Sequence, residues 1–298
     1  AYAENNPMVA EIALCTGDIQ ITKLDKGAQV EGALQPGDAL RTKDKPDSRC
    51  RLGFPNGNTV DLGPDTIIKI DNGQEITLVE GQLVAYAMPT LGQQEHAMRL
   101  HISNGILALS MGKIYATVKD KPQIAVFNDL VSAVWRDNSG EKILYPGNLV
   151  SLSAGTVEIS QAPREMELQV SMAMSPEIPA VNRATQAYKA KDLVTAERLF
   201  RQIQQVYPYN PAASYHLGVL DLNANKTEQA AQQWQKYKEI DPDAAQKAGV
   251  TKQLSLVKTK AIQDEVKNAV ANEKSISDLA PEPNSIAVHP LINKGEEQ

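Results

Sequence analysis

The sequence has few aromatic residues, few cysteines, no excess of positive charge and no long apolar run. Aromatic residues make up 5% of the 298 positions, so platforms for stacking on sugars are scarce. The formal net charge of -6 argues against nucleic acid as a partner, because proteins that bind the phosphate backbone usually carry a basic stripe. No apolar run approaches the roughly 20 residues that cross a bilayer, which predicts that the chain has no membrane span.

The bulk composition is that of a globular protein. With 42% hydrophobic and 22% charged residues the chain can bury a large core, and its length suggests about two domains. The first three residues, Ala1-Tyr2-Ala3, have the small-x-small form that precedes signal-peptidase cleavage. Residues 1–8 are therefore either the start of an exported, processed protein or an ordinary N-terminal segment.

Residues 9–160 alternate apolar and polar side chains in short segments separated by turn signals, which is the period of a β-strand. Many short strands at close spacing predict an all-β sandwich, roll or solenoid. The clearest strands are 18–22, 49–54, 66–70, 82–86, 113–118 and 123–127, and the turns lie at 36–38, 55–57, 71–73, 103–105, 138–140 and 146–148.

Two cysteines, Cys15 and Cys50, lie within two of the predicted strands. In an exported protein an even count favours a disulfide, which for a loop of this size contributes roughly 3 to 4 kcal/mol in the chain-entropy model. The alternative is a pair of small buried residues that never meet. The sequence leaves both interpretations open.

From residue 180 to about 275 the pattern is helical, and part of it recurs after 34 residues. A period of this length is typical of helical repeats, which bury their faces against each other and offer a concave surface for binding. The matching pairs are Ala184 and Gly218, Ala196 and Ala230, Phe200 and Trp234, Ile203 and Tyr237, Val206 and Ile240, and Pro208 and Pro242.

The segments beside the repeats differ from them. Residues 161–179 hold three prolines and predict a linker, with Met166, Met172 and Met174 available for packing along the β-domain. A helix over about 251–274 is predicted to cap the last repeat. Its apolar positions are Leu254, Val257, Ala261, Val266 and Val270.

Prolines predict that the tail, 276–298, is extended. Within it, 285–292 is apolar and strand-like. This piece is either frayed or adds a strand to a neighbour's sheet edge, with Ile286 and Val288 as contact residues.

No residue pattern predicts a catalytic, cofactor-binding or metal site. Gly105 and Gly112 are separated by six residues, which is too many for a P-loop, and Ile114 stands where Ser or Thr is needed. His96 and His101 differ by an odd number, so in one strand they would face opposite ways. Neither a nucleophile elbow nor a Ser-His-acid arrangement can be assigned. The protein is therefore predicted not to be an enzyme.

Several tyrosines lie in or beside the repeats, and aromatic residues are enriched at binding hot spots. Tyr237 takes a core position of its repeat. Tyr209 and Tyr215 lie near the turn between the repeats and the start of the next helix, so they are the candidates for contact with a partner.

Three motifs in the first half of the chain resemble the FecR domain family. They are Gly17-Asp18-Ile19-Gln20-Ile21, the turn Pro36-Gly37-Asp38 followed by Thr42, and the turn Pro55-Asn56-Gly57 before Leu62-Gly63, with Asn56 in place of the usual Asp. Later glycine turns extend the likeness over about residues 9–155. The resemblance implies an exported β-rich domain that makes contacts. The family's signal relay needs a membrane helix and a cytoplasmic segment; neither is seen here, so the relay is not carried over.

The region of about 180–245 resembles tetratricopeptide repeats. The small residues at 184, 196, 218 and 230, the aromatic residues Phe200 and Trp234, and Pro208 and Pro242 carry this resemblance. Arg183 departs from it, since the second repeat has Leu217 there, and Ala180 and Ser214 occupy positions that often hold Trp. Two repeats and a cap predict a groove that is short or that depends on another subunit.

These features predict a non-enzymatic scaffold or adaptor of the periplasm or outer membrane, which contacts envelope proteins through both modules. A second hypothesis is a structural subunit that forms homo-oligomers by strand exchange through 285–292. A third is binding of cell-wall glycan, such as peptidoglycan, by the β-domain, with Trp135 and Tyr86 as stacking platforms.

Overall fold

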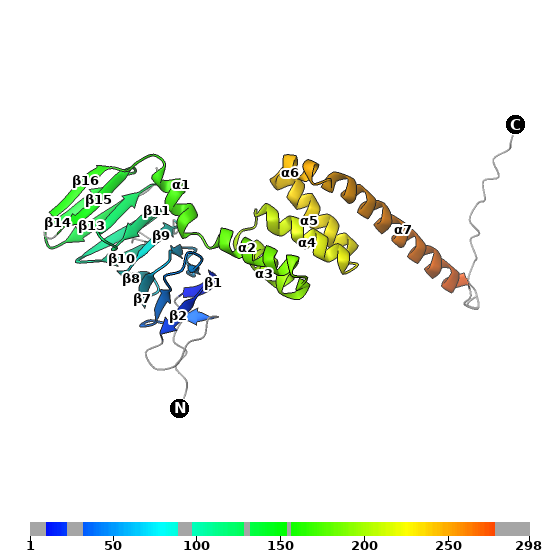
Figure 1. Cartoon of the computed structure of the whole chain (residues 1–298), viewed down its shortest axis with the longest axis horizontal. Helices are drawn as coiled ribbons and strands as arrows, with labels where there is room; N and C mark the ends of the chain where they lie inside the picture. The colour runs from blue at the N-terminus through cyan, green and yellow to red at the C-terminus, as the bar shows by residue number, and fades with distance from the viewer. Residues whose placement is uncertain (1–9, 23–31, 89–96, 128–131, 154–155, 278–298) are drawn as a thin grey trace, which may run out of the picture. The chain divides into compact units, whose positions relative to one another are not determined.

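The computed structural model describes residues 10–22, 32–88, 97–127, 132–153 and 156–277 (Figure 1). Contacts divide the chain into two compact units, Ala1–Ala213 and Ser214–Gln298. The first unit holds the strands and three helices, and the second holds helices alone. The predicted fold class, a β-domain followed by an all-α repeat region, is confirmed.

The described strands of the first unit form one continuous sheet. Its path runs β2-β4-β7-β8-β10-β11-β9-β6-β5-β1-β3, and β12 to β16 branch from it through β11. The strands are β1 (Ala10–Thr16), β2 (Ile19–Thr22), β3 (Ala33–Leu34), β4 (Ala39–Thr42), β5 (Arg49–Gly53), β6 (Thr59–Leu62), β7 (Thr66–Asn72), β8 (Glu75–Glu80), β9 (Gln82–Ala87), β10 (Met98–Ile102), β11 (Gly105–Thr117), β12 (Gln123–Val126), β13 (Ser132–Asp137), β14 (Gly140–Leu144), β15 (Asn148–Ser153) and β16 (Thr156–Gln161).

The long strand β11 joins the two halves of this sheet. Its first part pairs with β10 and β13, and its second part pairs with β9 and β12. Between them the register shifts at Leu109 and Met111, and Gly112 has a φ of 116°. Glycine adopts this conformation without a steric penalty, and an irregularity of this kind bends a strand. The bend lets the sheet curl back on itself.

The core lies between the two halves of the curled sheet. Ile68 and Leu100 from one half and Leu52 and Leu83 from the other are fully buried in a single cluster. Burying a side chain of this size contributes roughly 1.5 to 3 kcal/mol relative to leaving it exposed. The alternating pattern of the sequence therefore reports which side of each strand faces this core.

Cys15 on β1 lies directly opposite Cys50 on β5, and a disulfide joins them. Their Cα atoms are 4.1 Å apart. The bond links two neighbouring strands near one edge of the sheet.

The segment 161–179 is not an irregular linker, because it contains the helix α1 (Met166–Met174). Met166, Val170 and Met174 recur at every fourth residue and so lie on one side of this helix. They pack against Val84 and Tyr115 on the outer face of the sheet. The predicted use of the methionines thus holds for two of them, whereas Met172 is 53% exposed.

The first repeat hairpin consists of α2 (Glu177–Lys189) and α3 (Leu193–Val206), and both helices contact β1. Since α1 and this hairpin pack on the sheet, they belong to the first unit. The contacts therefore divide the chain at 213 and 214, inside the repeat region, and not at the predicted linker.

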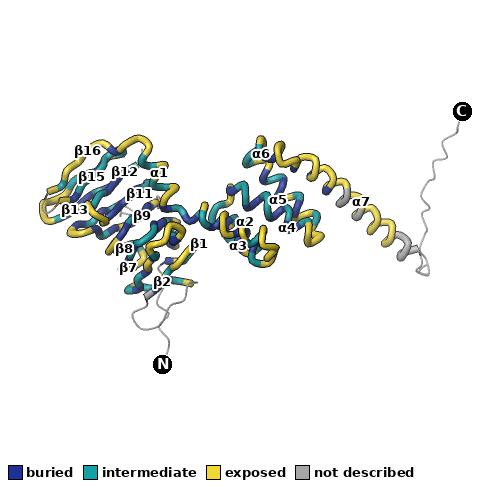
Figure 2. Tube along the Cα trace, viewed as in Figure 1, coloured by how far each residue is buried: buried dark blue, intermediate teal, exposed yellow. Residues whose placement is uncertain are grey.

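The second unit contains α4 (Pro211–Asn223) from Ser214 onward, α5 (Thr227–Ile240), α6 (Pro242–Lys247) and α7 (Val250–Ser277). The predicted cap begins at the expected place, but it buries less than the sequence indicates. Leu254 and Val257 pack against Trp234, whereas Val266 and Val270 are exposed. Figure 2 shows most of α7 as exposed. The reason is length, since α5 has 14 residues and α7 has 28.

Several predictions fall on residues outside the described ranges. They concern the N-terminal segment 1–8, His96, His289, and the tail with Ile286 and Val288. Among the described residues, the structure contains no helix that is both long enough and apolar enough to span a bilayer.

Candidate functional site

Each helix hairpin buries a large aromatic side chain at the position that the 34-residue repeat predicts. Phe200 on α3 is 0% exposed, and Trp234 on α5 is 1% exposed. Ala184 and Ala196 are fully buried in the first hairpin. Ala230 is fully buried in the second hairpin, which consists of α4 and α5. The two proline positions follow helix ends, since Pro208 comes shortly after α3 and Pro242 begins α6.

Gly218 explains how the second hairpin accommodates the larger aromatic ring. A Cβ atom at Gly218 would overlap the indole of Trp234, so only glycine fits beneath this ring. The indole Nε1 donates a hydrogen bond to the carbonyl oxygen of Tyr215 at 3.2 Å. The first repeat combines alanine with phenylalanine at the same two positions, and the second combines glycine with tryptophan.

The two candidate tyrosines differ in how much of their surface is available. Tyr209, in the turn between α3 and α4, is 80% exposed. Tyr215 is half-buried, and its ring packs at 5.5 Å from the ring of Tyr237 and at 5.2 Å from that of His216. Tyr209 is thus the better placed for a partner, while Tyr215 contributes to the packing of its own unit.

A charged pair on the sheet anchors the end of the first hairpin. Arg51 on β5 lies opposite Asp61 on β6, and its Nε and Nη2 atoms each donate to a carboxylate oxygen of Asp61 at 2.6 Å. Such a two-point bond fixes the plane of the guanidinium group. The ring of Tyr207, at the C-terminal end of α3, covers this group at 4.6 Å from its carbon atom. The hydroxyl groups of Tyr207 and Ser175 are 3.0 Å apart.

Arg51 and Tyr207 both keep their protons across the physiological pH range. Burial opposes the charge of Arg51, but the hydrogen bond and attraction of Asp61 outweigh it and raise the pKa of this guanidinium. Burial also raises the pKa of the Tyr207 phenol, and the negative charge of Asp61 raises it further. Both groups therefore stay protonated near neutral pH.

A groove of about 580 Å³ opens beside this anchor. Tyr86 and Met172 line it and are 37% and 53% exposed, and Ile178 is 48% exposed. The Lys113 Nζ atom bridges to Glu167 at 3.3 Å on its wall. The groove thus exposes an aromatic and a methionine side chain, which are types enriched at protein interfaces, beside a charged pair on its wall.

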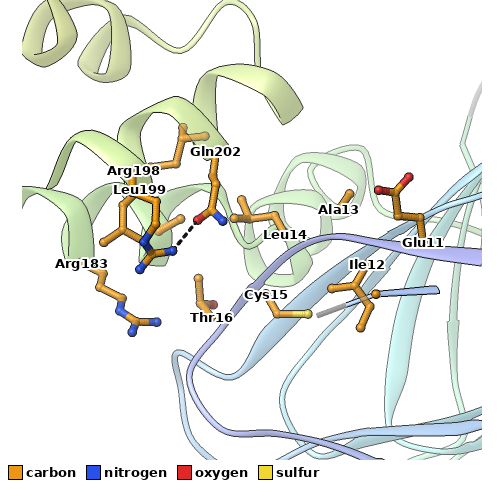
Figure 3. A pocket seen from close by; sticks show the side chains of 13 residues that line it. Glu11, Ile12, Ala13, Leu14, Cys15, Thr16, Arg183, Arg198, Leu199 and Gln202 are labelled. Atoms are coloured by element: carbon orange, nitrogen blue, oxygen red, sulfur yellow. Dashed lines mark hydrogen bonds between the residues drawn. The ribbon is translucent and has the colours of Figure 1, made fainter. Parts of the chain in front are cut away.

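A second pocket, of about 750 Å³, lies between β1 and the first hairpin (Figure 3). Its walls include Glu11 to Thr16 of β1 and, across from them, Arg183 of α2 and Arg198 of α3. The Arg198 Nη1 atom donates a hydrogen bond to Gln202 Oε1 at 3.2 Å. In this view Glu11 lies at one end of the strand, and the two guanidinium groups lie on the side of Thr16.

The prediction that Trp135 offers a stacking surface is wrong. Trp135 is 0% exposed, its ring packs on Gly105, and its Nε1 donates to the Asp137 carboxylate at 2.9 Å. The mixed polar and apolar residues of β13 (Ser132–Asp137) do not indicate that the Trp135 side chain is buried. Tyr86, the other predicted platform, lies in the groove beside the anchor.

The described histidines do not gather into a site. His101 Nε2 lies 3.9 Å from Glu75, and no group of three His, Cys, Asp or Glu side chains suited to a metal ion occurs within the described ranges. Sequence reasoning also missed the anchor and the arginine pair, because Arg51 and Asp61 look like ordinary solvent-facing residues of alternating strands.

Comparison with known proteins supports the prediction of tetratricopeptide repeats in the helical region. The tetratricopeptide repeat family model matches residues 187–252. Two crystal structures, at 1.65 and 2.50 Å, of a protein described as an anti-sigma factor from Parabacteroides distasonis ATCC 8503 are similar at 10% identity and a TM-score of 0.37. The similarity covers 44% of this chain and 62% of that chain, and such a low score does not assign a function. No curated protein sequence matches the chain.

Proposed function

We propose that this protein is a non-enzymatic adaptor of the cell envelope, which binds other proteins through its repeat hairpins and through a FecR-like β-domain. The match of the tetratricopeptide repeat family to residues 187–252 carries this proposal. Repeats of this kind present surfaces for binding, and their stability comes from neighbouring helices rather than from a ligand.

The disulfide supports the location outside the cytoplasm. Cys15 and Cys50 are bonded, and the described residues contain no other cysteine. Disulfides persist in oxidising compartments such as the periplasm and are rare in the cytosol. An adaptor that carries one in its β-domain is suited to the envelope.

Two surfaces supply contacts for partners in this proposal. Tyr209 lies in the turn that follows the first hairpin, and most of its surface is exposed to solvent. The groove beside Arg51 exposes Met172, Ile178 and Tyr86. Exposed aromatic and methionine side chains are the types enriched at protein interfaces.

The proposal is tested by capture from envelope extract with three forms of the full chain: the natural protein, Tyr209→Ala and Val194→Ala. Val194 is 82% exposed and serves as the matched control for loss of an exposed side chain. If Tyr209 is a hot spot, its truncation costs about 2 kcal/mol, which is roughly a 30-fold weaker complex, whereas the control binds normally.

Quantitative binding of the captured protein to each form provides the readout. A partner held equally by all three forms, and equally by Met172→Ala, would reject both proposed surfaces. Repeated failure to recover any partner under mild conditions would reject the adaptor function.

A further inference from the structure

The last strand of the sheet, β16, lies at an edge and is exposed to solvent. Within the described part of the chain it pairs with β15 alone, and β15 pairs on its other side with β12. Residues 158–161 of β16 are all exposed (Figure 2). An uncovered strand edge presents backbone donors and acceptors to solvent, and these can pair with another strand.

The hydrogen bonds at the end of β16 show which backbone groups point outward. In an antiparallel pair, residues that bond to the partner strand alternate with residues that point away from it. The Ala162 N–H donates to the carbonyl oxygen of Gly147, so the even-numbered residues of β16 bond to β15. The residues whose backbone groups point away are Val157, Ile159 and Gln161. In agreement, the Val157 carbonyl oxygen accepts a hydrogen bond from Lys142 Nζ on β14, at 3.2 Å.

The same edge carries an apolar side chain that is only partly covered. Ile159 lies opposite Val150 of β15, so the two side chains are on the same side of the sheet, toward the core. Val150 is fully buried, whereas Ile159 is 45% exposed, because no described strand lies beyond β16 in the sheet. A further strand beside β16 would remove this apolar surface from water, which is favourable.

We propose that β16 of a second copy of the chain occupies this edge, antiparallel to the first, so that one sheet continues through both copies. In this arrangement Ile159 lies opposite Ile159 of the second copy, and Val157 lies opposite Gln161. The N–H of Gln161 takes the place of the Lys142 ammonium group at the Val157 carbonyl. The pairing covers Ile159 on both sides of a two-fold axis.

The sequence of β16 favours this register over its neighbours. A shift of two residues in one direction would place Glu158 opposite Glu158 of the second copy, and like charges directly opposite each other destabilise a sheet. A shift in the other direction would place Pro163 opposite Val157, and proline has no N–H to donate. In the proposed register Glu158 lies opposite the uncharged Ser160, so β16 is complementary to itself.

The first test measures the native mass of the full chain by sedimentation equilibrium. Because β16 is short, the complex is expected to be weak, and the concentration series should reach about 1 mM. Ser160→Glu places a carboxylate opposite Glu158 at two symmetric positions and should weaken the dimer roughly tenfold. The control, Thr156→Glu, adds the same charge to the same face of β16, but opposite Ala162, and should leave the dimer unchanged.

A second substitution makes this test independent of how well each variant folds. Combining Ser160→Glu with Glu158→Lys places opposite charges across the axis and should restore the dimer at least to its natural strength. A dimer that Ser160→Glu weakens and Glu158→Lys does not restore would overturn the register.

The second test concerns the apolar contact. Ile159→Lys places two ammonium groups opposite each other and should abolish the dimer. The matched control is Ile143→Lys, which changes an isoleucine of β14 that is 57% exposed and should leave the native mass unchanged. A natural chain that stays monomeric over the whole concentration series overturns the proposal, as does a dimer that withstands both Ser160→Glu and Ile159→Lys.

Discussion

The two helix hairpins carry the same repeat but are stabilised by different surroundings. The first hairpin packs on β1, and its last residue before the turn, Tyr207, covers the Arg51 and Asp61 pair of the sheet. The second hairpin builds a core around Trp234 with Gly218 and the start of α7. The hairpins of a two-repeat array can therefore be covered by a sheet in one case and by a single capping helix in the other.

The difference shows what a short repeat array requires. Each hairpin leaves one apolar face that a neighbour must cover. In the first unit a sheet made of distant residues provides the cover, whereas in the second unit the cover follows directly in the chain. The following four predictions separate these two kinds of support, and they run from the largest expected effect to the smallest.

Trp234→Ala should destabilise the second unit selectively. Removing a fully buried tryptophan costs about 3 to 5 kcal/mol of the free energy of unfolding. Trp135 then remains as the only tryptophan and reports on the β-domain. In a urea titration followed by circular dichroism at 222 nm, the helices of the second unit should unfold at a lower urea concentration than in the natural protein. The urea midpoint of Trp135 fluorescence should not change. A matching shift of Trp135 would show that the units unfold together.

Replacing both Cys15 and Cys50 by alanine should destabilise the first unit and leave the stability of the second unit unchanged. The bond closes a loop with a sequence separation of 35, and its loss costs about 3 to 4 kcal/mol in the chain-entropy model. The first unit should unfold at lower urea, as seen in Trp135 fluorescence of a Trp234→Phe background. The helical transition of the second unit serves as the internal control and should not move.

Arg51→Met should loosen the link between the first hairpin and the sheet. It leaves the nearly buried carboxylate of Asp61, 9% exposed, without its charged partner, which costs about 1.5 to 3 kcal/mol in the first unit. Combining it with Asp61→Leu removes the unpaired charge and should recover part of the loss. If the double variant is as unstable as the sum of the single ones, the two residues are not coupled.

Tyr207→Phe should have the smallest effect at neutral pH. It keeps the ring over Arg51 and removes only the hydrogen bond with Ser175, worth about 1 kcal/mol. The pH dependence is more informative. Because burial raises the pKa of this phenol in the folded state, its contribution to stability is complete below pH of about 10 and declines above it.

Above that pH the unfolded chain loses a proton that the folded chain keeps, so unfolding is favoured. Unfolding of the natural protein and the Phe variant should therefore be compared between pH 8 and 11, with the variant showing the shallower decline. Parallel curves would place Tyr207 in an environment more like water than the structure indicates.

Much of the architecture follows from local patterns in the sequence. The alternation in 49–54 and 82–86 gave β5 and β9, and the spacing from Ala184 to Gly218 gave two hairpins. The prediction of a linker at 161–179 missed α1, since prolines at 163 and 176 frame the helix rather than interrupt it. The cap was predicted at the right position, but its exposed second half was not.

The candidate sites were harder to predict because they join residues that are far apart in the chain. Nothing in the sequence around Tyr207 indicates its contact with Arg51, because that contact depends on the docking of α3 against the sheet. Trp135 looked available for a ligand, yet the curl of the sheet buries it against Gly105. Arg183 departs from the repeat pattern in the sequence, and only the docking of α2 beside β1 places it in one pocket with Arg198.

The sequence by itself determined the order of strands and helices, the period of the repeat and the recurrence of small and aromatic residues 34 positions apart. These depend on side-chain periodicity and volume, which neighbouring residues carry. The tertiary structure alone decided that Cys15 meets Cys50 and that the first hairpin joins the sheet. Such features depend on which strands and helices come to lie side by side, and short-range patterns do not encode that choice.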